Sequence, residues 1–170
     1  LVPAGDCNIS KVDLDVDGDP DVLASIEDAG KVEWYENSGS GNFRTRAVTD
    51  STVGVKSAFA ADFDQDGDLD IVTVSYSDAY RDDKIAWFEN TGNKSFSNQK
   101  IIGGYLKIRG PMAVAAADFD GDGFPDIVAA STGRDEIVWF ENLLEDTGVD
   151  ELTEKPNHFG LTQNYPNPFN

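Results

Sequence analysis

The sequence predicts an all-β fold made of repeated units, and three observations support this. An acidic phrase occurs three times, at 13–22, 62–72 and 118–128. Each phrase is followed by a tryptophan phrase (VEWYEN, IAWFEN or IVWFEN), and the tryptophans lie 53 and 52 residues apart. A period of about 50 residues with several short strands per unit is typical of a β-propeller or a solenoid. No segment has a sustained apolar period of 3.6 residues, so helices should be scarce.

The second unit shows how the strands should follow one another. Its expected strands are 55–61, 69–76, 84–90 and a weaker fourth at 95–102. Polar or glycine-containing turns separate these segments, as expected for antiparallel neighbours. The first unit has a matching outer strand at 42–48, whereas the third unit runs from Asn142 directly into a polar stretch.

The tryptophan strand is apolar on both of its faces. One face carries the tryptophan with Val32, Ile85 or Ile137, and the other carries Tyr35, Phe88 or Phe140. A strand that is buried on both faces lies in a sheet between two neighbouring layers, as in stacked propeller blades. We therefore expect the tryptophans to pack between blades rather than to stack on sugars. Propellers need about four to eight blades, so further blades outside this sequence, or an open array, are expected.

Composition excludes several classes of function. The chain has 170 residues, of which 32 are acidic and 13 basic, giving a net charge of −19. This balance argues against binding to nucleic acid or to anionic membranes, and no apolar run is long enough to span a bilayer. The single cysteine, Cys7, excludes an internal disulfide and a cysteine zinc site, and is expected to be buried on a first strand. The single histidine, His158, is expected to be solvated in a linker.

The acidic phrases carry the chemistry. Within each phrase, aspartate falls at loop positions one, three, five and nine, and glycine at position six permits a sharp turn. The side chain at position seven varies, which is acceptable because this residue can bind a metal through its backbone carbonyl. These hard oxygen ligands suit Ca²⁺ better than Mg²⁺. The expected metal residues are Asp13, Asp15, Asp17, Asp19 and Asp21, then Asp62, Asp64, Asp66, Asp68 and Asp70, and finally Asp118, Asp120, Asp122, Phe124 and Asp126.

The loops hold 14 of the 32 acidic residues. With one ion in each loop, up to three calcium ions are expected. Two carboxylates ~4 Å apart repel by roughly 1 kcal/mol in water and more in a partly buried loop, and a divalent cation removes this repulsion. The loops are not EF-hands, because position twelve is Ala24, Thr73 or Ala129 instead of a bidentate glutamate. The residues leaving the loops are also β-branched. The metal is therefore expected to stabilise a hairpin rather than to drive a switch.

The loop pattern, with an apolar strand before it, Asp-Ile-Val after it and the Trp-Phe-Glu-Asn phrase, resembles the FG-GAP/VCBS repeat, to which the integrin α-subunit head is related. The resemblance covers about residues 5–142. It implies a β-propeller of four-stranded blades with calcium in the hairpin loops. The final segment, 163–170 (QNYPNPFN), resembles the opening of the C-terminal sorting domain of type IX secretion substrates. That resemblance implies export, and the export machinery as a partner.

Two other groups of residues have structural explanations. Glu36, Glu89 and Glu141 recur at one blade position, so they are expected to be structural rather than a glycosidase acid/base pair. The patch formed by Tyr105, Lys107 and Arg109 is interpreted as a loop between blades, with a ligand contact as the alternative.

The expected organisation is a propeller region at 1–142, with repeats at about 5–50, 51–103 and 104–142. A polar linker at 143–162 and the beginning of a sorting domain at 163–170 follow. Since the sequence begins without methionine and stops within this phrase, we expect it to be part of a longer protein. The predicted function is non-enzymatic: an extracellular or cell-surface calcium-binding module for adhesion to a glycan or a surface protein. The alternative is an accessory propeller domain of a larger secreted polymer-degrading enzyme.

Overall fold

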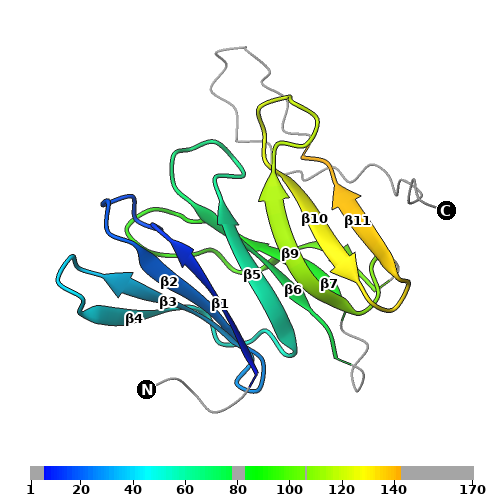
Figure 1. Ribbon diagram of the computed structural model, residues 1–170, viewed down its shortest axis with the longest axis horizontal. Coiled ribbons are helices and arrows are strands. Elements are labelled where there is room, and N and C mark those ends of the chain that lie inside the picture. The colour runs from blue at the N-terminus through cyan, green and yellow to red at the C-terminus, as the bar shows by residue number, and fades with distance from the viewer. Residues whose placement is uncertain (1–5, 78–82, 106, 143–170) are drawn as a thin grey trace.

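The computed structural model of the chain describes residues 6–77, 83–105 and 107–142. These residues form eleven strands in three antiparallel sheets, which lie side by side in chain order (Figure 1). The predicted all-β fold class is therefore confirmed. The sheets have the form of propeller blades, and within the described part of the chain they do not close into a ring. None of the described residues forms a helix long and apolar enough to cross a membrane.

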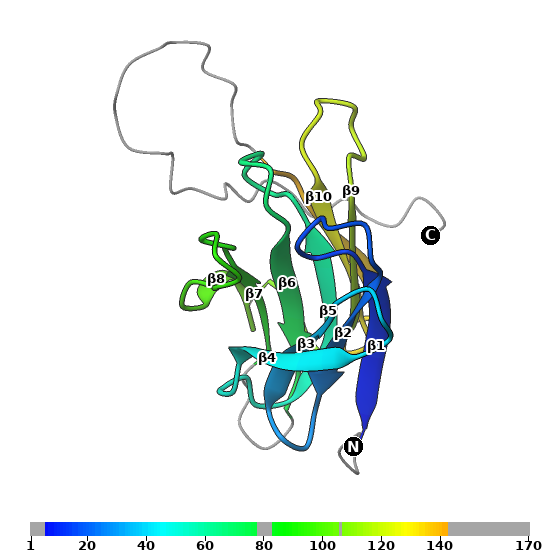
Figure 2. The ribbon, with the colours of Figure 1, turned by 90° about the vertical axis from the view of Figure 1, so that its left-hand side faces the viewer.

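Blade 1 is a four-stranded sheet whose strands follow the order of the chain. Its strands are β1 (Cys7–Val12), β2 (Asp21–Ile26), β3 (Lys31–Asn37) and β4 (Phe43–Thr49). The fourth strand agrees with the segment 42–48 expected from the sequence. In Figure 2, blade 1 lies in front of blade 2.

Blade 2 repeats the same order with β5 (Val55–Ala61), β6 (Asp70–Ser75), β7 (Lys84–Phe88) and β8 (Lys100–Gly104). The first three strands agree closely with the prediction. The fourth begins later than the expected 95–102, because residues 91–95 form a tight turn and only an isolated bridge joins Asn90 to Phe96. Blade 3 has three described strands, β9 (Pro111–Ala117), β10 (Asp126–Ser131) and β11 (Glu136–Phe140).

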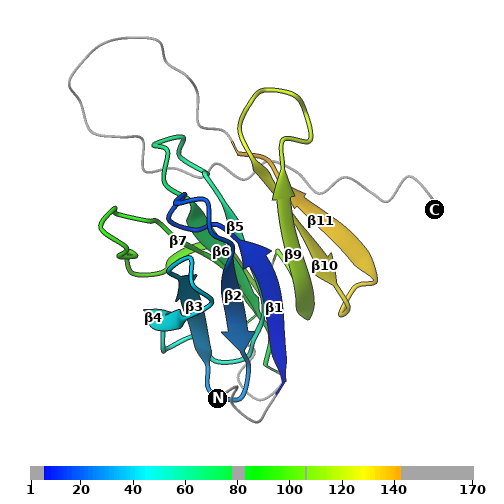
Figure 3. The same ribbon diagram turned by 60° about the vertical axis from the view of Figure 1, so that its left-hand side comes forward.

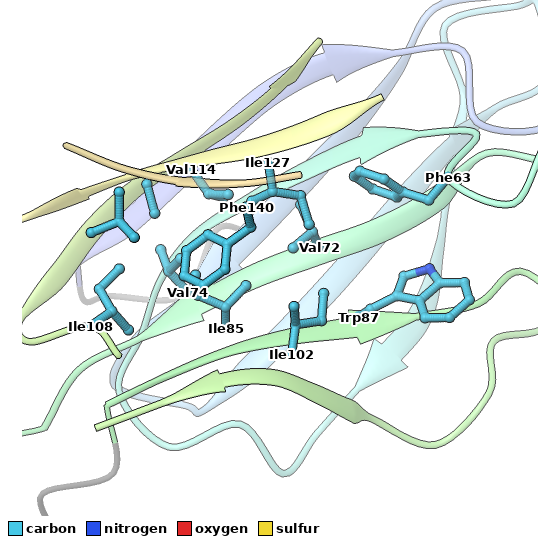
Figure 4. Packing of buried hydrophobic residues seen from close by; sticks show 12 residues of the cluster. Phe63, Val72, Val74, Ile85, Trp87, Ile102, Ile108, Val114, Ile127 and Phe140 are labelled. Atoms are coloured by element: carbon cyan, nitrogen blue, oxygen red, sulfur yellow. The ribbon is translucent and has the colours of Figure 1, made fainter. Parts of the chain in front are cut away.

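Blades 1 and 2 share one apolar core, to which the tryptophan face of blade 1 contributes. Leu23, Val32 and Trp34 are at most 1% exposed and pack in one cluster with residues of blade 2, among them Ile71 and Phe88. The second cluster joins blade 2 to blade 3 in the same way, with Trp87 and Val72 on one side and Ile127 and Phe140 on the other (Figure 4). The prediction that Trp34 and Trp87 pack between blades is confirmed.

Two expectations about burial were wrong. Ile137 was expected on a strand that is buried on both faces, but it is 66% exposed. It lies on the tryptophan face of blade 3, the face that in blades 1 and 2 packs against the following blade, and no described residue of the chain forms such a layer there. Cys7 lies on the first strand as expected, but it is exposed, because β1 is the edge strand of the first sheet.

Candidate metal loops

The three acidic phrases form hairpin loops at the same end of the three sheets (Figure 3). They connect β1 to β2, β5 to β6 and β9 to β10, so each loop joins the first two strands of its blade. In each hairpin the last residue of the first strand pairs with the ninth loop residue; Val12, for example, pairs with Asp21. Each loop therefore enters its second strand at a fixed point of the sheet, and the three loops have equivalent positions.

The first aspartate folds each loop back on itself. In the first loop, Asp13 Oδ1 accepts the N–H of Asp17 at 3.1 Å and Oδ2 accepts that of Gly18 at 3.0 Å. In the second loop, Asp62 accepts the N–H groups of the equivalent residues, Asp66 and Gly67, both at 3.1 Å. In the third loop, Asp118 accepts the N–H of Gly123, at position six, at 3.0 Å, but its second bond comes from Gly121, at position four, at 2.6 Å. The fifth aspartate then accepts the N–H of the seventh residue, at 2.9, 3.0 and 2.8 Å for Asp19, Asp68 and Phe124.

This curl requires glycine at position six. The φ angles of Gly18, Gly67 and Gly123 are 93°, 94° and 95°, in a region that side chains with a Cβ atom rarely adopt. The fourth position also has a positive φ, 55° at Val16 and 56° at Gln65. The sequence predicted the glycine turn but gave no signal for the strained fourth residue.

The curled loops bring carboxylates together. In each loop, three aspartates offer one oxygen each, and the three oxygens lie within 4.8 Å of one another. The clusters are Asp13, Asp15 and Asp21 in the first loop, Asp62, Asp64 and Asp66 in the second, and Asp118, Asp120 and Asp122 in the third. Of the fifteen residues predicted as ligands, these nine meet in clusters; whether any of the fifteen binds metal stays a prediction.

The ninth aspartate has a different environment, because it is buried and holds the backbone of the blade. Asp21 is 1% exposed, and its carboxylate accepts hydrogen bonds from Leu14 N (3.1 Å), Trp34 Nε1 (2.8 Å) and Asn37 N (2.7 Å). Asp126 accepts the N–H groups of Phe119 and Asn142 at 3.2 and 2.8 Å. The ninth residue therefore ties the start of its loop to the end of the tryptophan strand.

In the second blade, the ninth residue also has an altered acidity. Burial raises the pKa of Asp70 to about 7, although the N–H of Asn90, which donates to this carboxylate, favours its charged form. A neighbouring carboxylate, Asp64, adds to the increase. A cation beside these groups would stabilise their charged form.

The carboxylate of Asp15 provides a test of whether the first loop fits a metal ion. Its side chain is only 9% exposed, and Oδ1 is buried with no hydrogen-bond partner among the described residues. A buried carboxylate oxygen without a partner is costly. A hard cation held by carboxylate oxygens would satisfy Oδ1, so the donor set of the first loop fits Ca²⁺.

Comparison with known families agrees with this geometry. The sequence profile of the FG-GAP-like repeat matches residues 13–73 and again residues 62–129, which together cover more than half of the chain. The chain belongs to the FG-GAP-like repeat family. A search of curated proteins found no match to the chain.

In the first two repeats, the glutamate of the tryptophan phrase forms an ion pair with a basic side chain of the outer strand. Arg46 on β4 forms an ion pair with Glu36 at 2.6 Å and lies 5.4 Å from the ring centre of Trp34. In the second repeat, Lys100 on β8 binds Glu89 at 2.5 Å and lies 4.3 Å from the ring centre of Trp87. These two glutamates thus help to fix the outer strand, in agreement with the structural role expected for them.

Two features of the FG-GAP repeats escaped the sequence reasoning. The asparagine that ends each tryptophan phrase presents its N–H to the ninth aspartate, and Asn142 Nδ2 also donates to Phe63 O of the preceding blade at 2.9 Å. Its repetition in the three phrases was an available signal. The second feature is Lys94, which reaches the first loop from blade 2; nothing in the repeat pattern indicates it.

The patch at the entrance to blade 3 has the form of an inter-blade loop. Arg109 lies 4.5 Å from the ring centre of Tyr105, and its backbone oxygen accepts hydrogen bonds from Ser131 Oγ at 2.5 Å and Gly133 N at 3.1 Å. These bonds attach the loop to blade 3. A ligand contact at the patch of Tyr105, Lys107 and Arg109 stays an untested alternative.

Glu36 gives a prediction about pH. Hydrogen bonds from Arg46 and Lys94 lower the pKa of Glu36 from 4.5 to about 2. Since its folded-state pKa is depressed, Glu36 contributes stability above the ordinary value, and this contribution is lost as the pH falls from about 5 towards 2. We expect Glu36→Gln to cost on the order of 1 kcal/mol in the free energy of unfolding at pH 7, and much less at pH 3. Urea unfolding in EDTA at both pH values measures this, with the exposed Asp28→Asn as control; a cost independent of pH would contradict the assignment.

Proposed function

We propose that the chain is a secreted or cell-surface, calcium-binding β-propeller module that binds a partner and is not itself an enzyme. The observation that supports this most directly is the recurrence, in three loops of equivalent position, of three carboxylate oxygens within 4.8 Å of one another. Membership of the FG-GAP-like repeat family, a family of binding modules, supports the same function. A glycan or a surface protein is the proposed ligand.

In this proposal each loop holds one Ca²⁺. The ligands in the first loop would be Asp13, Asp15 and Asp21, with the other two clusters acting alike, and the remaining loop residues predicted from the sequence would complete the coordination. The ion would neutralise mutual repulsion among carboxylates and so stabilise the hairpin that opens each blade. The loops' common position at one end of the sheets makes that end a rigid surface for a ligand.

We also propose that the protein is exported from the cell. The segment 163–170 lies outside the described residues, as does the linker at 143–162, so both stay predictions from the sequence. The resemblance of 163–170 to the start of a type IX sorting domain supports secretion, and calcium is plentiful outside cells. We propose the division into a propeller region at 1–142, a linker and a sorting segment on the same grounds.

Thermal unfolding tests the calcium sites directly. If a loop binds with a dissociation constant near 10⁻⁴ M, Ca²⁺ at about 10 mM stabilises the fold by about 2.7 kcal/mol per site. For a chain of this size, this corresponds to a rise in melting temperature of roughly 5–10 °C for one site, relative to EDTA. Mg²⁺ at the same ionic strength should have a much smaller effect. A cooperative transition at the same temperature in Ca²⁺, Mg²⁺ and EDTA would contradict the proposed calcium sites.

A further inference from the structure

The first acidic loop differs from the third, because a lysine from the neighbouring blade forms an ion pair with one of its aspartates. Lys94 Nζ is 2.6 Å from Asp15 Oδ2, forms a second ion pair with Glu36 and lies 5.7 Å from the ring centre of Trp34. All three partners belong to blade 1, whereas Lys94 belongs to blade 2. At the position equivalent to Asp15, Asp120 of the third loop is exposed and forms no ion pair with another described residue.

The backbone conformation that places Lys94 against the first loop is unfavourable for a lysine. It lies in the turn between β7 and β8, where Ser95 N donates to Gly92 O at 3.2 Å, and the φ angles of Asn93 and Lys94 are 53° and 62°. Tight hairpin turns with two positive φ angles favour asparagine followed by glycine, so the backbone of a lysine at the second position is strained. The ion pairs with blade 1 offset that strain.

The lysine also borders a space beside the first loop. A cavity of about 200 Å³ lies between the loops and the β7–β8 turn, and Asp15, Asp68, Asn90 and Lys94 are among the residues that line it. Lys94 is 36% exposed, whereas Asp15 and Glu36 are 9% and 12% exposed. The ammonium group can therefore leave Asp15 for solvent without disturbing the core, while Arg46 continues to bind Glu36.

From this geometry we propose that Lys94 is an affinity-determining residue, whose ammonium group competes with the divalent cation for Asp15 in the first loop. The inference rests on the proposed calcium sites. A positive charge 2.6 Å from one oxygen of a ligand carboxylate repels a cation bound to the same group and must be weakened or displaced when the cation binds. The first loop therefore binds calcium more weakly than its carboxylates alone would allow. Because coupling is reciprocal, bound calcium weakens the link that Lys94 forms between the blades.

Calcium titration of the 170-residue chain tests this proposal. Asp64→Asn and Asp120→Asn together remove one carboxylate from each of the other loops, and asparagine can still accept the hydrogen bonds that Asp66 N and Asp122 N donate there. In this background, we expect Lys94→Met to tighten calcium binding about tenfold, measured by isothermal titration calorimetry. Lys100→Met is the matched control: it removes the same charge from an equivalent Trp–Glu pair, and it should change the affinity less than twofold.

A second measurement separates competition from a merely structural role. Because Lys94 stabilises the calcium-free state more than the calcium-bound state, Lys94→Met should lower the melting temperature more in EDTA than in saturating calcium. An equal loss in both conditions, or an unchanged or weaker calcium affinity in the titration, would overturn the proposal while leaving the calcium sites intact. If the unsubstituted chain neither binds calcium nor melts higher in its presence, the calcium sites and this proposal fail together.

Discussion

Replacing Asp21 with alanine should lower the free energy of unfolding by about 3–5 kcal/mol, even in EDTA. The carboxylate is 1% exposed and accepts three hydrogen bonds, from Leu14 N, Trp34 Nε1 and Asn37 N. Alanine leaves all three donors without their acceptor in a place that water reaches poorly, and an unsatisfied buried donor costs about 1–3 kcal/mol. Urea unfolding followed by tryptophan fluorescence measures the loss.

Two further variants make the test specific. Asp28→Ala removes the same charge from an exposed position in the turn between β2 and β3, and should change the free energy of unfolding by less than about 0.5 kcal/mol. Asp21→Asn keeps one acceptor oxygen and should lose less than the alanine variant. If Asp21→Ala is as stable as Asp28→Ala in EDTA and is weakened only in calcium, Asp21 acts as a metal ligand alone and the hydrogen bonds contribute little.

The sequence predicted most of the fold, because each blade repeats the same local signals. The bounds expected for β5, 55–61, agree with the structure, and polar or glycine-containing turns separated the first three strands of blade 2. The prediction was poorer for β8, since hydrogen bonds within the turn at 91–95, rather than an apolar pattern, delay the start of that strand. The exposure of Ile137 was missed for another reason. Periodicity tells which face of a strand is apolar, but it does not tell what covers that face.

The site was predicted less completely than the fold. Sequence spacing made every aspartate of a loop look like a ligand, because it shows only that the carboxylates alternate. The structure divides them by environment: the first and fifth curl the loop through backbone N–H groups, whereas the ninth is buried against the tryptophan strand. The contact between Lys94 and Asp15 joins residues 79 positions apart. Such a contact depends on how two blades pack, and no local pattern encodes it.

Replacing Phe140 with alanine should have an effect as large as the loss of Asp21, through a different mechanism. Phe140 is 3% exposed and packs in the core that joins blade 3 to blade 2 (Figure 4). Its ring lies directly against β8, since a Cβ atom added to Gly103 would be 3.1 Å from Phe140 Cε1. Truncation leaves a cavity that the β8 backbone cannot fill, so we expect a loss of about 3–5 kcal/mol. A thermal melt should show a midpoint lower by roughly 10 °C.

The exposed phenylalanine at the start of β4 provides the matched control for this prediction. Phe43 is 52% exposed, so Phe43→Ala removes the same atoms without opening a cavity and should cost less than about 1 kcal/mol. Phe140→Leu retains most of the buried volume and should lose less than half as much as Phe140→Ala, which keeps the test informative if the alanine variant does not fold. Since Phe140 itself contributes no carboxylate to a loop, both Phe140 variants should keep the calcium response expected of the unsubstituted chain while they remain folded. A Phe140→Ala loss no larger than that of Phe43→Ala would mean that blade 3 does not pack on blade 2 through this core.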